Sequence, residues 1–128
     1  MENDFLDRSG WQTMLDREQM PDASACIGVL RRNEFVARLG TLLIWYGKAG
    51  GIQAAFRDYH GDAGSDLAVL LVADEDAVQT LLARGLTSIP ALVRAGRLHP
   101  YILKTLDELE SAGLADFVED MGLTFPKH

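Results

Sequence analysis

Apolar residues follow two patterns along the chain, continuous runs and helical spacing, and each pattern predicts one kind of element. Continuous apolar runs rich in β-branched and aromatic residues predict buried strands over 25–30, 41–46 and 67–73. Apolar residues three and four positions apart predict helices over 9–19, 33–39, 52–60 and 106–121, and another after the capping residue Asp74. Strands that alternate with helices in this order predict an α/β domain with parallel strand pairs.

Turn and capping residues mark where these elements begin and end. Ser9 with Gln12, and Thr105 with Glu108, have the spacing of capping boxes. Asn33 is a candidate cap for the helix over 33–39, whose apolar residues Phe35, Val36 and Leu39 are predicted to face inward. Ile89-Pro90 is predicted to open a strand over 91–93, which a turn at 94–97 connects to a returning strand over 101–103. This closing hairpin adds antiparallel pairing, so the predicted sheet is mixed, with helices on both faces.

Length and charge narrow the class of protein. The chain has 128 residues, which fits one domain with a real core. Its formal net charge of −7 argues against nucleic-acid binding, which needs clustered Lys and Arg, and against binding to an anionic membrane surface. The charge favours a basic protein partner, although solubility alone also explains it.

The chain has one cysteine, Cys26, which excludes an internal disulfide, a CxxC pair and a four-ligand zinc site. Because Cys26 lies in an apolar strand, we expect a buried thiol rather than a reactive one. The first fifteen residues lack a basic-then-apolar signal pattern, and the apolar runs are too short to span a bilayer. These features predict a cytoplasmic protein that needs no cofactor or metal.

Several of these segments together resemble the thioredoxin family. The run 42–46 (Leu-Leu-Ile-Trp-Tyr) is similar to the family's central strand, and 88–92 (Ser-Ile-Pro-Ala-Leu) is similar to its segment with a cis-proline. The turn 94–97 stands where the family has its Asn-Gly hairpin, and the helix from Leu106 matches the C-terminal helix. The resemblance implies a thioredoxin-like domain over 25–122, with an N-terminal helical extension over 1–24 and a flexible tail over 123–128.

The chain departs from the family at the active-site turn. Where the family has Cys-Gly-Pro-Cys, this chain has Lys48-Ala49-Gly50-Gly51-Ile52, without sulfur. Because disulfide exchange needs a thiolate, the family's activity is not expected here. The resemblance therefore implies a scaffold that has lost its chemistry and works by binding another protein or an extended peptide.

The expected binding surface comprises the end of the central strand, the turn after it and the proline segment. A cis bond before Pro90 would leave backbone groups of Ser88 and Ile89 free to pair with an extended peptide. The aromatic residues at 45 and 46 are either partner contacts or core residues. The predicted partner-binding residues are Trp45, Tyr46, Lys48, Ala49, Gly50, Ser88, Ile89 and Pro90.

Three functions remain open at this point. The extra N-terminal helix and the missing CxxC resemble the thioredoxin-like chaperones of hydrogenase maturation, which implies binding of the twin-arginine signal peptide of a hydrogenase small subunit. A thiol- or glutathione-dependent enzyme that uses Cys26 is the catalytic alternative. A homo-oligomeric scaffold is the third, in which the helix over 9–19 packs on a neighbouring copy.

Overall fold

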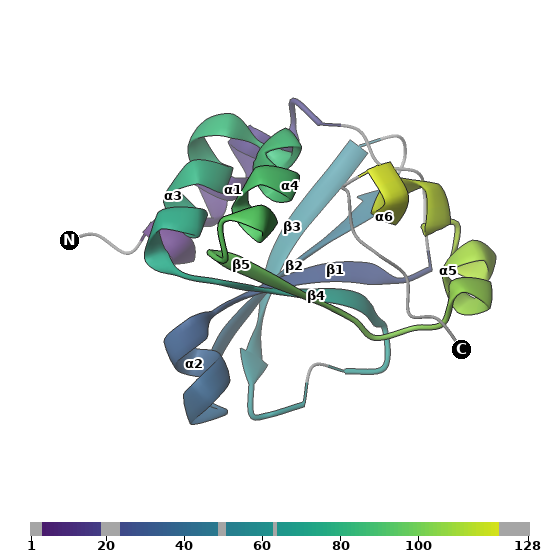
Figure 1. Ribbon diagram of the computed structural model, residues 1–128, viewed down its shortest axis with the longest axis horizontal. Coiled ribbons are helices and arrows are strands. Elements are labelled where there is room, and N and C mark those ends of the chain that lie inside the picture. Colours follow the sequence, from purple (N-terminus) through teal and green to yellow (C-terminus); the bar gives the residue numbers. More distant parts are fainter. Residues whose placement is uncertain (1–3, 19–23, 49–50, 63, 121–128) are drawn as a thin grey trace.

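The computed structural model describes residues 4–18, 24–48, 51–62 and 64–120. These residues form an α/β fold around a five-stranded mixed sheet with the strand order β3-β2-β1-β4-β5 (Figure 1). The strands are β1 (Cys26–Arg31), β2 (Gly40–Lys48), β3 (Gly51–Tyr59), β4 (Leu67–Ala73) and β5 (Leu98–Ile102).

Helices lie on both sides of this sheet. Helices α1, α3 and α4 cover one face, α2 lies on the opposite side, and α5 and α6 lie together near one end (Figure 1). The helices are α1 (Arg8–Leu15), α2 (Arg32–Ala37), α3 (Glu75–Arg84), α4 (Ile89–Arg94), α5 (Leu106–Ala112) and α6 (Ala115–Asp120). Two short 3-10 turns, η1 (Asp4–Leu6) and η2 (Leu86–Ser88), precede α1 and α4.

The strand pairing differs from the predicted set of parallel pairs. Strands β1, β2 and β3 form an antiparallel meander, β4 lies parallel to β1, and β5 returns antiparallel to β4. Only β1 and β4 are therefore parallel among the described strands. The sheet is mixed, as predicted, but β2 and β3 are joined by a hairpin rather than separated by a helix.

Alternation along the strands divides the apolar residues between two cores. Ile27 and Val29 of β1 face the larger core beneath α1, α3 and α4, whereas Cys26 and Leu30 face a smaller core on the opposite side. Strand β4 is buried along its whole length because both of its faces are covered. This explains why its sequence is continuously apolar.

The N-terminal helix α1 is part of the larger core. Trp11 and Leu15 have no exposed surface, and the exposed fraction of Met14 is 1%. The indole Nε1 of Trp11 donates a hydrogen bond to the Phe5 carbonyl at 2.8 Å. The apolar face of this helix is therefore covered by its own chain, so it cannot supply the contact between copies that the sequence suggested.

Residues 51–59 form strand β3, so the helix predicted over 52–60 is wrong. Ile52, Phe56 and Tyr59 fit a helical spacing, but in the structure alternate residues face opposite sides of the sheet. All nine residues of β3 pair with β2, from Gly51 opposite Lys48 to Tyr59 opposite Gly40. Pairing with a neighbouring strand satisfies the backbone here, which a local pattern does not reveal.

The strand predicted over 91–93 is also wrong, because these residues belong to helix α4. Pro90 lies in the first turn of this helix, where the missing N–H costs no hydrogen bond. All peptide bonds between described residues are trans, including the one before Pro90. The backbone arrangement on which the predicted strand addition at Ser88 and Ile89 depended is therefore absent.

The helix predicted over 33–39 exists as α2, but its burial differs from the prediction. It begins at Arg32 rather than after an Asn33 cap, and it ends at Arg38, which has a left-handed φ of 59°. Phe35 is half-buried, as expected for an inward residue, whereas Val36 and Leu39 are exposed. This short helix therefore presents apolar side chains to solvent.

Several local predictions are confirmed. Strand β4 has the predicted bounds, and Asp74 caps α3 by accepting a hydrogen bond from the Ala77 amide at 2.9 Å. Thr105 and Glu108 form the predicted capping box of α5. At α1, however, the cap position is Asp7, and Gln12 instead bonds to β3. The confirmed features all depend on residues that are close in sequence.

Candidate functional site

The residues predicted to form a binding surface around Trp45 and Ile89 do not meet on the surface. Both of these side chains are completely buried in the larger core. Trp45 lies there because it shares the inner side of β2 with Leu43. Its indole N–H has no acceptor among the described residues, so apolar packing positions the ring. Burial of both side chains works against the prediction that they contact a partner, and it favours the core alternative for Trp45.

The other predicted residues are spread over separate parts of the molecule. Tyr46 is half-buried beside the smaller core, on the opposite face of the sheet from Trp45. Ser88 and Pro90 are half-buried at the start of α4, where Ser88 Oγ donates a hydrogen bond to the Gly85 carbonyl at 2.7 Å. Three predicted positions fall outside the description, namely the side chain of Lys48 and the residues Ala49 and Gly50.

Ser88 borders an open hollow of about 690 Å³ between α3 and α4. Its charged lining includes Arg97, which pairs with Asp76 at 2.7 Å and with Asp74 at 3.4 Å. These carboxylates neutralise the guanidinium that an anionic ligand would otherwise use. Arg84 also lines the hollow and has no ion pair among the described residues, so the lining holds one guanidinium that no carboxylate neutralises.

Cys26 is a buried thiol, as the sequence predicted. Its exposed fraction is 4%, and Sγ lies 3.5 Å from the carbonyl oxygen of Asp66. Burial, reinforced by the charge of Asp66, raises the pKa of Cys26 to about 11. Because the thiolate is the reactive form, this environment works against thiol catalysis at neutral pH.

An ion pair lies next to Cys26 on the same side of the sheet. Arg57 of β3 donates two hydrogen bonds of 2.9 Å to the carboxylate of Asp66, which immediately precedes β4. The hydrogen bonds from Arg57 hold the pKa of Asp66 below its usual range. This ion pair connects β3 with the start of β4, and these two strands are not neighbours in the sheet. It therefore has a structural role and leaves no free base beside the thiol.

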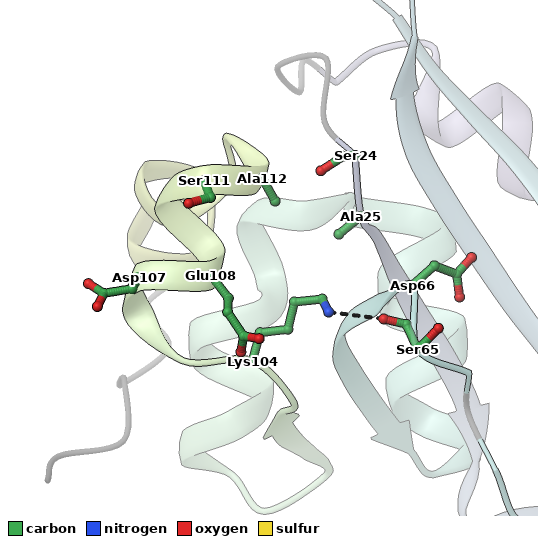
Figure 2. Close-up of a pocket in the computed structure, with 9 residues that line it drawn as sticks. All are labelled: Ser24, Ala25, Ser65, Asp66, Lys104, Asp107, Glu108, Ser111 and Ala112. Carbon is green, nitrogen blue, oxygen red and sulfur yellow. Dashed lines mark hydrogen bonds between the residues drawn. The ribbon is translucent and has the colours of Figure 1, made fainter.

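A polar groove of about 320 Å³ lies between α5 and the starts of β1 and β4 (Figure 2). Lys104 Nζ crosses it to donate a hydrogen bond to the Ser65 carbonyl at 2.9 Å. Glu108 accepts from the Thr105 amide at 2.8 Å within the capping box, and Asp107 points away from the groove (Figure 2). The carboxylates thus serve local structure and form no acid–base pair across the groove.

The clearest unpartnered feature is an apolar surface that we call the α2 patch, formed by Phe35, Val36, Leu39 and Tyr101. Val36 is 75% exposed, Leu39 is 60% exposed and Tyr101 of β5 is 44% exposed. The rings of Phe35 and Tyr101 stack with centroids 5.3 Å apart, which joins the helix to the edge strand. In Figure 1, α2 lies on the opposite side of the sheet from α1, α3 and α4.

Sequence reasoning missed this surface because it assigned Val36 and Leu39 to the core. The short length of the segment between Arg31 and Arg38 was a signal for this exposure, because so short a helix can cover little of a sheet. In the structure α2 has no fully buried side chain. Apolar residues at helical spacing are therefore exposed here, which is typical of an interaction surface.

No protein-family model matches this chain, and no curated protein is significantly similar to it. Among the described residues, no three His, Cys, Asp or Glu side chains come together as they would to hold a metal ion. In the same part of the chain, no helix has the length and hydropathy that crossing a membrane requires.

Proposed function

We propose that this chain is a non-catalytic protein-binding module that contacts its partner through the α2 patch. The observation that carries the proposal is the exposure of Val36 and Leu39 next to the stacked pair Phe35 and Tyr101. Contiguous exposed apolar groups of this kind mark interaction sites, and aromatic residues are enriched in them. The raised pKa of Cys26 works against the alternative of a thiol enzyme.

The finer fold assignment, a thioredoxin-like domain, is part of the proposal and not its basis. The mixed five-stranded sheet with helices on both faces supports it. The antiparallel pairing of β1, β2 and β3 differs from the parallel pairs that the sequence predicted. The binding proposal needs only the exposed surface, so it does not depend on the family.

A narrower version of the proposal is a cytoplasmic chaperone of hydrogenase maturation that binds a twin-arginine signal peptide. The polar groove in Figure 2 supports this version, because the carboxylate of Glu108 lines it and carries negative charge. Neighbouring arginines in a peptide pair well with carboxylates. A twin-arginine peptide that competes with the captured partner, and loses this ability in the Glu108→Gln variant, would favour the groove over the α2 patch.

The experiment that tests the proposal begins with capture of a partner on the immobilised full chain, followed by titration of the purified partner. Replacing Leu39 with serine is expected to weaken binding by about tenfold or more, because an apolar contact at the centre of an interface is lost. Leu39 is 60% exposed, so the free energy of unfolding should change by less than about 0.5 kcal/mol.

The matched control is Leu106→Ser, because Leu106 is also an exposed leucine but lies on α5, away from α2 (Figure 1). We expect this control to bind like the unaltered chain. Equal affinities of the Leu39→Ser and Leu106→Ser variants would contradict the assignment of the α2 patch.

A further inference from the structure

Each edge of the sheet carries a feature that works against an added strand, namely Gln12 at β3 and Pro100 in β5. At the β3 edge, the Gln12 side chain donates to the Ile52 carbonyl at 2.7 Å and accepts from the Ala54 amide at 2.9 Å. The amide group of Gln12 therefore occupies the hydrogen-bonding positions of residues 52 and 54, which a neighbouring strand would use. Strand addition at β3 would require these two hydrogen bonds to break.

At the opposite edge, Pro100 lies in the middle of β5. Just outside β5, the amide of Leu103 donates to the Ala68 carbonyl, and the Arg97 carbonyl accepts from the Asp74 amide. Because these bonds alternate along an antiparallel pair, the backbone N–H and C=O groups of odd-numbered residues in β5 point toward β4. Pro100 therefore lies on the outward side, where it removes a donor from the free edge. Proline at such a position is a known protection of edge strands.

We therefore expect a partner at the α2 patch to dock by side chains and to satisfy its own backbone. An amphipathic helix meets this requirement, because its backbone hydrogen bonds are internal and its apolar face is free. Val36 and Leu39 are exposed in the same short segment as Phe35, whose ring stacks on Tyr101, so this segment offers apolar side chains to such a face.

The charges that border the α2 patch are positive, although the whole chain has a net charge of −7. Arg32 and Arg38 lie at the two ends of α2, and neither has an ion-pair partner among the described residues. Arg32 only donates to the Gly96 carbonyl at 3.3 Å. Glu34, the acidic residue of α2, is bound by Arg31 at 2.6 Å.

We propose that the occupant of the α2 patch is the apolar face of an acidic amphipathic helix from another protein, with carboxylates placed to meet Arg32 and Arg38. This inference rests on the proposed function and adds the chemistry of the partner. A second copy of this chain fits less well, because two copies joined through this patch would bring the same arginines together. Rim charges of this kind mainly govern association rate and specificity, so binding should weaken as salt increases.

The test uses two synthetic helical peptides and the 15N-labelled full chain. One peptide has leucines along one face with glutamates flanking them, and the other has lysines in place of the glutamates. We expect the glutamate peptide to shift the amide signals of residues 32–39 and 98–103, with at least about fivefold tighter binding than the lysine peptide at low salt. The Arg38→Glu variant should lose this preference, and the neutral Arg38→Gln variant should weaken it.

The control variant is Arg84→Glu, because Arg84 is an exposed arginine of α3, on the other side of the sheet. It makes the same change in net charge and should keep the preference for the glutamate peptide. Equal binding of both peptides, or signal shifts confined to other residues, would overturn the inference. So would a concentration-dependent dimer that Leu39→Ser abolishes, since the occupant would then be a second copy. If neither peptide binds while the captured partner still depends on Leu39, the acidic helix is wrong and the proposed function stands.

Discussion

Replacing Trp11 with alanine is expected to lower the free energy of unfolding by about 3–5 kcal/mol, the usual range for removal of a large buried aromatic side chain. Trp11 is fully buried and packs edge-on against Phe5, with ring centroids 6.0 Å apart. The substitution also removes the hydrogen bond from Nε1 to the Phe5 carbonyl. Urea unfolding of the full chain measures the effect as a lower midpoint, from which the change in free energy follows.

The control for this prediction is Thr13→Ala, which alters an exposed residue of the same helix. Alanine favours helices more than threonine does, so this variant should be as stable as the unaltered chain or slightly more stable. A loss below about 1 kcal/mol for Trp11→Ala would contradict burial of this side chain in the core. It would also indicate that α1 is a separate N-terminal extension and does not belong to the core.

The second large effect concerns Gly28, which lies in β1 between β2 and β4. A Cβ atom added there would lie 2.9 Å from Leu67 Cδ1 and 3.2 Å from Leu42 Cδ1, closer than side-chain carbons normally approach. Because both leucines are buried in the smaller core, they have little room to move. Gly28→Ala is therefore expected to destabilise the fold by about 1–3 kcal/mol through overpacking.

A double-mutant cycle separates this steric effect from other causes. Leu67→Ala removes the nearest side-chain carbons, so Gly28→Ala should cost much less in that background, with a coupling energy above about 0.5 kcal/mol. Urea unfolding of the four proteins gives this coupling. Additive effects would show that Gly28 and Leu67 do not contact each other as described.

The parts of the fold that the sequence predicted are those that depend on local chemistry. The continuous apolar run of β4 gave its bounds because a strand buried on both faces needs apolar residues at every position. The caps Asp74 and Thr105 were found because each side chain bonds to a backbone amide three residues ahead. Neither feature requires knowledge of the tertiary structure.

The pairing of β3 and the element that contains Pro90 could not be predicted from local chemistry. The apolar residues Ile52, Phe56 and Tyr59 are compatible with both a helix and a strand, and the pairing of β3 with β2 decided between them. Pro90 was assigned to a strand opening, although the first turn of a helix accepts proline equally well. Contacts distant in sequence determined both outcomes.

The α2 patch illustrates the same limit for the candidate site. Periodicity placed Val36 and Leu39 on an apolar helix face, and such a face normally points inward. Whether it does so depends on how much of the sheet the helix covers, which is a property of the packed structure. Trp45 and Tyr46 were included in the predicted binding surface, but alternation in β2 buries Trp45 completely and Tyr46 in part.

The most direct test of the account is hydrogen–deuterium exchange of the full chain, alone and in complex with the protein that it captures. The account predicts slower exchange of backbone amides in residues 32–39 and 98–103 of the complex, with unchanged exchange in α5. Protection of α5 and of the segment around Ser65, with residues 32–39 unchanged, would contradict it and would assign binding to the polar groove instead.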